Sequence, residues 1–447
     1  MNKNLIIRLL TIGLLMVILL VPIGLIRSVV ADRSQLQANV EQTIAETSAG
    51  AQRVAGPILV VPYVERELVI TTNEKGLEKR TWIDNPRQAV FVPTRSNITA
   101  NVNVEEKYKG LYKTLVFQTV SQMNARFEVP INLGLTAEPS HITIGKPYLS
   151  IGLSDVRGIS STPEISLNGR ALTPLNGTNW LRLGDGFHAD ADSFDSKIAA
   201  QFELVVKLNF TGTRSLSIAP IGKTTTVKIA SPWPHPNFSG RFSPQSRAIS
   251  ASGFAAQWEV SQLASRNTDF IESPAKADSV LESFDVTFIE PVNIYLQAER
   301  AVKYGVVFVA LTFAAFFVFE TLKNLRIHPL QYGLVGLALA LFFLLLVSLS
   351  EHVKFLYAYL AASIACVTLI AYYLRYVLGS WRRGFWFGAK LTIQYAVLYG
   401  LLLSEDNALM LGSMLLFVVL AAIMFVTRHI DWYRLGNLTE GKSKAVD

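Results

Sequence analysis

The chain has 447 residues, half of them apolar and 17% charged, a composition that favours a membrane protein. Its net charge of +7 is unevenly placed, because residues 31–300 hold 26 basic and 27 acidic residues while the remainder carries +8. A nucleic-acid-binding protein concentrates basic residues in its folded domain, so this distribution argues against nucleic acid as a partner. The one cysteine, Cys366, lies in an apolar run, which excludes disulfide bonds and cysteine-based zinc sites.

Six apolar segments are each long enough to cross a bilayer as a helix. They contain about 20 residues apiece, or roughly 30 Å of helix, which is the thickness of the hydrocarbon core. The segments are residues 5–26, 302–322, 330–350, 355–374, 386–404 and 407–427. The sequence therefore predicts one N-terminal helix, a large polar region outside the membrane, and five C-terminal helices.

The short connections between these segments predict how the chain is oriented. Two of the connections and the C-terminal tail carry basic residues, namely Lys323, Arg326, Arg375, Arg382, Arg383, Arg428, Arg434, Lys442 and Lys444. Of the two remaining connections, one holds only Lys354 and the other holds no basic residue. Since positive residues mark the cytoplasmic side, both termini are predicted to be cytoplasmic, and residues 31–300 lie on the opposite side of the membrane.

The first segment has a second interpretation as a cleaved signal peptide, because the string "VVA" at 29–31 offers small residues near a cleavage site. Its apolar run is, however, longer than the core of a typical signal peptide, and Arg27 interrupts the approach to that site. An uncleaved anchor is therefore the favoured prediction.

Residues 31–300 are predicted to form a β-rich domain with a leading helix. The helix covers residues 32–47, where Leu36, Val40 and Ile44 share one helical face. From residue 57 onward, runs of β-branched and aromatic residues alternate with turn residues, as in a mostly antiparallel, sandwich-like domain of two sheets or subdomains. The fold class is thus an α+β membrane protein.

The predicted organisation has four parts. They are a transmembrane anchor at 1–30, the β-rich domain at 31–300, a five-helix transmembrane domain at 301–430 and a cytoplasmic tail at 431–447. Residues 291–303 are predicted to be helical and to lead into the second membrane segment.

Enzyme signatures are absent from the outer domain, which contains no G-x-S-x-G, no H-E-x-x-H and no phosphate-binding glycine loop. The acidic string "GDGFHADADSFD" at 184–195 offers oxygen ligands at alternate positions, as a hard cation such as calcium requires. It lacks the glycine and the terminal glutamate of an EF-hand loop, so a solvated acidic loop is the preferred interpretation. No enzymatic activity, metal or cofactor is predicted.

The string "SPWPHPNFSGRF" at 231–242 places three prolines within five residues, around Trp233. Because prolines fix the backbone, the indole of Trp233 could present a flat face to a glycan or a peptide. The alternative is a rigid crossover that holds aromatic side chains in the core, and this structural interpretation is favoured.

Ionisable residues inside membrane segments are costly and usually face a partner or a cavity. Glu320 lies near the inner end of the second segment, and Lys390 lies at a similar depth in the fifth. The sequence therefore suggests a Glu320–Lys390 ion pair, with both residues as hypothetical binding groups.

A second polar group is predicted at the outer rim of the membrane domain. Glu351, His352 and Lys354 occupy one outer connection, and Glu405 and Asp406 occupy the other. These residues could form a proton-accepting site, a contact for a lipid head group or a substrate, or a dock for the outer domain. The simpler interpretation is that short interfacial loops need polar residues in order to meet water.

Four strings resemble the CreD family of bacterial inner-membrane proteins, in the same order and over nearly the whole chain. They are "SAGAQRVAGPILVVPY" at 48–63, "LSIAPIGKTTTVKIASPWPHPNFSGRF" at 216–242, "FFVFETLKNLRIHPLQYGLVGLALALFFLLLVSLSEH" at 316–352 and "MLGSMLLFVVLAAIMFVTRHIDWY" at 410–433. The resemblance implies a Gram-negative inner membrane, a periplasmic domain, and a role in envelope integrity, envelope stress and tolerance of β-lactams. It implies no reaction and supplies no catalytic residues.

The expected function is support of the cell envelope through the periplasmic domain, which would bind envelope glycans, lipids or partner proteins. The alternative is a transporter or membrane-embedded enzyme that acts on a lipid-linked envelope substrate through the rim acids and Glu320. Few charged residues and no pair of interrupted helices lie in the segments, which weighs against a transporter. The ligand and the oligomeric state are not predicted.

Overall fold

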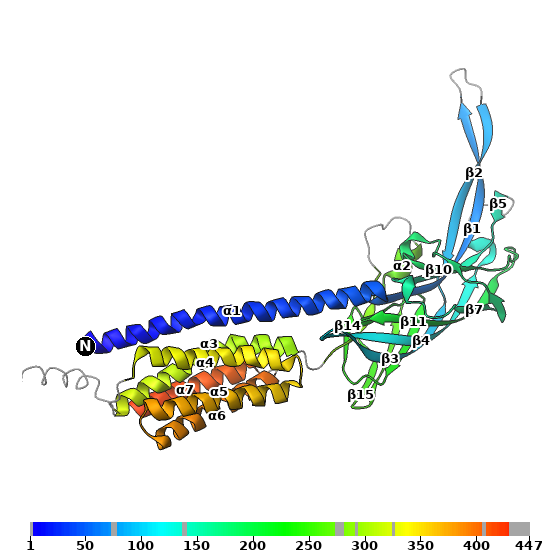
Figure 1. Ribbon diagram of the computed structural model, residues 1–447. Coiled ribbons are helices and arrows are strands. Elements are labelled where there is room, and N and C mark those ends of the chain that lie inside the picture. Colours follow the sequence, from blue (N-terminus) through cyan, green and yellow to red (C-terminus); the bar gives the residue numbers. More distant parts are fainter. Residues whose placement is uncertain are drawn as a thin grey trace, which may run out of the picture. The chain divides into compact units, whose positions relative to one another are not determined.

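The computed structural model describes residues 3–72, 78–135, 141–272, 281–290, 294–323, 327–404 and 408–428. The chain divides into two compact units (Figure 1). One unit consists of Met1–Ala38 and Val292–Asp447, and the other of Asn39–Pro291.

The first unit is helical, and each of the six predicted membrane segments coincides with a helix. Its helices are α1 (Lys3–Thr47), which continues into the second unit, α3 (Ile294–Lys323), α4 (Pro329–Ser350), α5 (Phe355–Val377), α6 (Trp381–Leu403) and α7 (Ala408–Thr427). Among the described residues, α1 and α3 to α6 are long and apolar enough to cross a membrane, and the apolar part of α7, Met410–Ala421, is shorter. The residues predicted to form a leading helix, 32–47, lie within α1.

The start of α4 explains the string "IHPLQY" in physical terms. His328 precedes the helix, and its Nδ1 accepts a hydrogen bond from the backbone N–H of Leu330 at 3.2 Å. The Gln331 Oε1 in turn accepts from the backbone N–H of His328 at 3.0 Å. These two bonds satisfy groups that a helix N-terminus otherwise leaves unpaired, and Pro329 fits the first helical turn.

Helix α4 lies at the centre of the packing within this unit. A Cβ added to Gly336 would stand 2.1 Å from Leu19 of α1 and 2.9 Å from Phe313 of α3. Only a glycine therefore permits the observed approach of these helices, as is common where membrane helices pack. Further along α4, the rings of Phe342 and Phe343 are buried.

The second unit contains two β-sheets. The nine-stranded sheet comprises β1 (Gln52–Thr72), β2 (Glu78–Phe91), β5 (Ile142–Ile144), β6 (Tyr148–Leu153), β9 (Leu175–Asn176), β10 (Gly186–Asp190), β12 (Ser215–Ala219), β14 (Pro236–Gly240) and β17 (Phe284–Phe288). The eight-stranded sheet has the order β15 (Ser246–Ser250), β16 (Gly253–Ser261), β13 (Thr224–Ser231), β3 (Arg95–Lys109), β4 (Tyr112–Val129), β11 (Ala200–Thr213), β7 (Glu164–Leu167) and β8 (Arg170–Leu172). A short helix, α2 (Asn267–Glu272), lies in the same unit.

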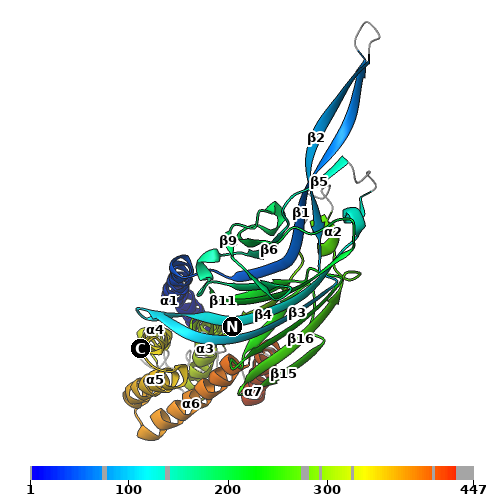
Figure 2. The same cartoon turned by 90° about the vertical axis from the view of Figure 1, so that its right-hand side faces the viewer.

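Alternating burial along the strands produces the core between the sheets. In β4, the odd-numbered residues from Phe117 to Val129 are buried and the even-numbered ones face solvent. Trp258 of β16 stacks on Phe284 of β17, with 4.5 Å between the ring centroids, and so joins the two sheets. The pairing is antiparallel except for β1 with β12 and β3 with β13, so the mostly antiparallel, sandwich-like domain is confirmed. Figure 2 shows the curvature of β3 and β4 and the hairpin of β1 and β2, which projects beyond the rest of the domain.

Within the second unit, the end of α1 contacts an ion pair formed by Arg157 and Asp155. The guanidinium of Arg157 donates to Asp155 Oδ2 at 2.7 Å and to the carbonyl oxygen of Glu46 at 2.5 Å. Asp155 also accepts from the backbone N–H of Gly50 at 3.1 Å. These contacts fix the turn that leads from α1 into β1.

The attachment of α1 should depend on pH only in acid. The hydrogen bonds from Arg157 hold the pKa of Asp155 below its ordinary value of about 3.9. A lowered pKa in the folded state gives stabilisation that is present above the unfolded pKa and is lost as the pH falls through the folded pKa. The protection factor at residues 46–53, which is the exchange rate relative to the intrinsic rate at the same pH, should therefore be constant between about pH 7 and pH 5 and should fall below about pH 4. Asp155→Asn should show the lower protection factor throughout, and a wild-type transition near neutral pH would contradict this account.

Candidate functional site

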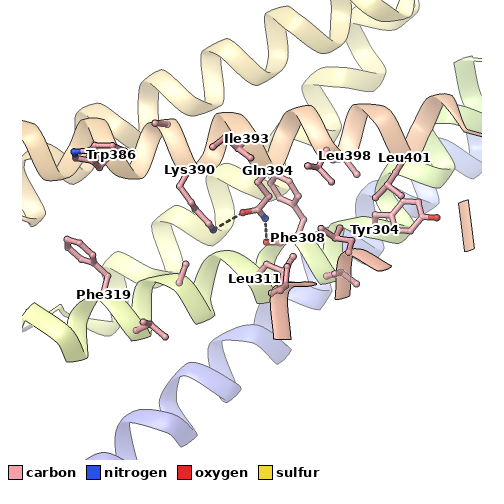
Figure 3. Close-up of a pocket in the computed structure, with 17 residues that line it drawn as sticks. Tyr304, Phe308, Leu311, Phe319, Trp386, Lys390, Ile393, Gln394, Leu398 and Leu401 are labelled. Atoms are coloured by element: carbon pink, nitrogen blue, oxygen red, sulfur yellow. Dashed lines mark hydrogen bonds between the residues drawn. The ribbon is translucent and has the colours of Figure 1, made fainter. Parts of the chain in front are cut away.

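A pocket of about 670 Å³ lies in the membrane unit between α3, α6 and α7. Its wall is almost entirely apolar, with Leu311, Ile393 and Leu415 as examples from the three helices. Figure 3 shows that the side chains of Lys390 and Gln394 extend from α6 toward α3 at this pocket. They form the polar part of an otherwise hydrocarbon-lined site.

The polar part is held by a chain of hydrogen bonds. Lys390 and Gln394 are four residues apart on α6, so they lie on one helical face, and Lys390 Nζ donates to Gln394 Oε1 at 2.7 Å. Gln394 Nε2 donates across to the backbone carbonyl of Phe308 on α3 at 3.0 Å and lies 3.3 Å from Thr312 Oγ1. The amide is thus fixed in place, and its oxygen is directed at the ammonium group.

The charge of Lys390 is not neutralised by an acid in the part of the chain that the structure describes. No carboxylate oxygen of these residues lies within 4 Å of its Nζ, and its other contact is the ring of Phe387, 5.6 Å away. An ammonium group among apolar side chains is costly unless a counter-charge accompanies it. The site is therefore chemically suited to a negatively charged group.

The predicted Glu320–Lys390 ion pair is wrong. Glu320 is 6% exposed, and its Oε2 accepts a hydrogen bond of 2.7 Å from the hydroxyl of Tyr332 on α4, while Lys390 is bonded to Gln394. Glu320 lies three residues before the end of α3, whereas Lys390 lies nine residues after the start of α6, and the two side chains meet different neighbours. Sequence spacing gives depth along a helix but not which neighbour each face meets.

In the connection between α4 and α5, the side chain of Glu351 is largely enclosed by the protein rather than solvated. Glu351 ends α4, its side chain is 8% exposed, and it lies 3.6 Å from the guanidinium of Arg33 on α1. The hydroxyl of Tyr295 on α3 donates to it at 3.2 Å. His352 is exposed, with its Nδ1 3.1 Å from the carbonyl oxygen of Ser348. Glu405 and Asp406 lie outside the described residues.

Glu351 should act as a structural contact that joins three helices of the membrane unit. Glu351→Ala removes the acceptor of the Tyr295 hydroxyl and the counter-charge of Arg33, which should lower the free energy of unfolding by about 1–3 kcal/mol. Thermal unfolding of the full chain in detergent measures this change. His352→Ala is the matched control and should alter the unfolding temperature little, because that side chain is exposed. Equal stability of the two variants would contradict this role.

Trp233 has a structural environment. The segment that contains it links β13 of one sheet to β14 of the other, and its indole N–H donates to the carbonyl oxygen of Ile289 at 3.1 Å. The ring is half-buried against the core. This geometry fits the rigid crossover better than a free binding surface.

The acidic string at 184–195 is occupied by contacts within the protein. Asp190 pairs with Lys146 at 3.1 Å, and Asp192 forms an ion pair with Arg170. His188 is buried, with Nδ1 2.6 Å from the carbonyl oxygen of Gly177 and Nε2 3.0 Å from the amide of Asn179. Within the described ranges, no group of three or more acidic, histidine or cysteine side chains could hold a metal ion.

Gln394 and Thr312 were not identified as candidate residues from the sequence. The available signal was the Lys390-x-x-x-Gln394 spacing, because an amide one turn after an isolated lysine in an apolar helix offers it an internal partner. Thr312 carries no such signal, since its role depends on which face of α3 meets α6.

Comparison with known proteins gives one close match and several distant ones. The model of the family described as "Inner membrane protein CreD" matches residues 4–433. The "Inner membrane protein CreD" of Escherichia coli (strain K12) is 38% identical over 430 residues, which cover 96% of this chain and 94% of that protein.

Solved structures resemble the chain only weakly. An M1 zinc metallopeptidase from Deinococcus radiodurans is 8% identical, with a TM-score of 0.21 over 44% of this chain and 42% of the other. Yeast LTA4 hydrolase in complex with bestatin is 10% identical, with a TM-score of 0.21 over 46% of this chain and 30% of the other. Likenesses of this size carry no argument about fold or activity.

Proposed function

The chain belongs to the CreD family of inner membrane proteins, and from this premise we propose that it supports cell-envelope integrity and the envelope-stress response by binding envelope components. The membrane unit contributes by binding an anionic lipid in the Lys390 pocket. One observation carries this proposal, namely the ammonium group of Lys390, which has no acidic partner among the described residues and lies at a 670 Å³ apolar pocket.

The apolar wall supports an acyl chain as one part of the ligand. The lining side chains are aliphatic or aromatic over three helices, including Val307, Leu398 and Val419. Ligand pockets of a few hundred cubic ångströms, lined mostly by such side chains with a few placed polar groups, are typical of binding sites for apolar molecules. A lipid tail can fill this space without leaving any polar group unpaired.

The charge supports an acidic group as the other part. Lys390 has three N–H donors, of which one bonds Gln394, so further donors are free to contact a phosphate or carboxylate oxygen. Lys390 lies nine residues after the start of α6, or about 13 Å along the helix axis. With the predicted orientation, that start is cytoplasmic. The bond to Gln394 directs the ammonium group a further turn into the membrane, so the acidic group of the ligand would have to enter the pocket to meet it.

The composition of the pocket favours binding over catalysis. Among the described residues, no serine, cysteine, histidine, aspartate or glutamate lines it, and the hydroxyl in the lining is that of Tyr304. The alternative function, transport or modification of a lipid-linked envelope substrate, would require that such a substrate be moved or altered. Dependence of substrate turnover on Lys390 or Glu320 would favour that alternative.

Native mass spectrometry of the full chain tests the proposal. The wild type, purified in mild detergent, should retain an anionic phospholipid in preference to a zwitterionic one of the same chain length. Lys390→Met has nearly the same volume but no charge and should reduce this retention about tenfold or more. Retention of both lipids in equal amounts by the wild type, or unchanged retention by Lys390→Met, would overturn the proposal.

A further inference from the structure

The solvent face of the eight-stranded sheet carries an unusual density of amide side chains. On β3, Asn97, Asn101 and Asn103 point outward, and on β4, Gln118 and Gln122 do so. These residues are cross-strand neighbours, since Asn103 pairs with Gln118 and Thr99 with Gln122 in the register of the two strands. The result is a ladder of uncharged hydrogen-bonding groups across adjacent strands.

Two hollows on this face form one groove. The first, of about 660 Å³, extends from β15 over β16 and β13 to β3 and β4, and the second, of about 380 Å³, continues over β4 to β11. Both hollows are lined by Asn101 and Val120, so they lie next to each other, and together they are called the groove. Six neighbouring strands spaced by about 4.8 Å give the groove a length of about 24 Å. Figure 2 shows β15, β16, β3 and β4 of this sheet, and β13 lies between β16 and β3 in the strand order.

Small side chains open the groove at one end. Ala230, Ala248 and Ala255 lie on three neighbouring strands, and the register pairs Ala255 with each of the other two. Val120 adds an apolar side chain that is 61% exposed in the middle of the face. The floor of the groove is therefore apolar and shallow, and the side-chain amides of β3 and β4 line it.

The groove carries no net charge on the residues that line it. Its two charged members, Lys207 and Glu164, form an ion pair of 3.0 Å with each other. The side-chain amides of Asn101 and Gln118 have no hydrogen-bond partner within the part of the chain that is described. Each amide can both donate and accept, as sugar hydroxyl and acetamido groups do, while apolar ring faces fit the alanine and valine floor.

We propose that this groove binds a strand of a neutral polysaccharide that contains N-acetylated sugars. A charged polymer would meet no unpaired charge among the lining residues, because Lys207 and Glu164 pair with each other. An extended peptide would pair with an open sheet edge rather than with this face. The inference extends the proposed binding of envelope components to the second unit. It uses a different surface and a different ligand from the Lys390 pocket, so either proposal can fail alone.

Titration of the full chain in detergent with a neutral oligomer of N-acetylglucosamine, followed by calorimetry, tests this proposal. Ala255→Trp fills the groove from an exposed position, and Asn101→Asp adds a charge at constant volume. Both should weaken binding about tenfold or more. Asn237→Asp is the matched control, because Asn237 is an exposed asparagine on a strand of the other sheet, and it should bind like the wild type, as should Lys390→Met.

Three results would overturn the proposal. They are the absence of binding by the wild type up to the solubility limit of the oligomer, unchanged binding by Ala255→Trp and Asn101→Asp together, and preferential binding of an anionic polysaccharide or of a neutral peptide. Loss of sugar binding in the groove variants with intact lipid retention would separate this site from the membrane pocket.

Discussion

Lys390→Met is expected to abolish function while leaving the fold as stable as before or more stable. The substitution removes an ammonium group that has no acidic partner among the described residues and replaces it with an apolar side chain of similar length. The free energy of unfolding should therefore stay constant or rise by up to about 3 kcal/mol, since a lysine at the centre of a membrane helix costs about 2.5–3.5 kcal/mol. Rescue of the envelope phenotype of a deletion strain, such as detergent or β-lactam sensitivity, should be lost at normal protein levels.

Two controls sharpen this expectation. Lys390→Arg keeps the charge and should rescue at least in part. Lys303→Met removes a lysine on α3 that is 56% exposed and paired with Glu299, and it should rescue fully. A Lys390→Met variant that loses stability together with rescue would show that the lysine is structural. Full rescue by Lys390→Met would show that the charge is not needed at all.

Trp258→Ala should produce the largest loss of stability in the second unit. The indole is 1% exposed, stacks on Phe284 with an interplanar angle of 11°, and donates to the carbonyl oxygen of Phe242 at 3.3 Å. Truncation leaves a cavity between the two sheets, where Phe238 also packs, and should cost about 3–5 kcal/mol. Hydrogen exchange of β16 and β17 peptides in the full chain should accelerate accordingly.

The matched control for this prediction is Trp82→Ala on the projecting hairpin. Its side chain is 49% exposed, so its truncation should change exchange in β16 and β17 little. Similar acceleration in both variants would contradict the assignment of Trp258 as the contact that joins the sheets.

Much of the fold could be predicted from the sequence because its signals are local. Hydropathy correctly predicted the positions of six helices. A helix in a bilayer must pair its own backbone N–H and C=O groups and needs about 20 apolar residues to cross, so its signal lies in one short stretch of sequence. The β-branched and aromatic runs likewise predicted strands, and one long strand, β4, covers two of these runs. The parallel pairs of β1 with β12 and β3 with β13 could not be predicted, because they join segments more than 100 residues apart.

The candidate site was only partly predictable, for a related reason. The sequence identified Lys390 as an expensive group, yet it named the wrong partner, because the rotation of each helix depends on packing contacts that spacing does not reveal. Glu351 was expected at a solvated rim and is instead buried between Arg33 and Tyr295. The neutral groove could not be predicted, because its lining residues come from strands far apart in the chain. Asn101 and Gln118 lie on β3 and β4, whereas Ala255 lies on β16.

Photo-crosslinking from inside the membrane pocket tests the central claim most directly. A benzophenone amino acid would replace Ile393, which lines the pocket, and, as the control, Ile364, an equally exposed isoleucine on α5. After illumination in native membranes, mass analysis of the adducts should find the Ile393 position enriched in anionic lipid relative to the Ile364 position. That enrichment should disappear in Lys390→Met. Adducts that match the bulk membrane at both positions, or that do not respond to Lys390→Met, would contradict anionic lipid binding at this site.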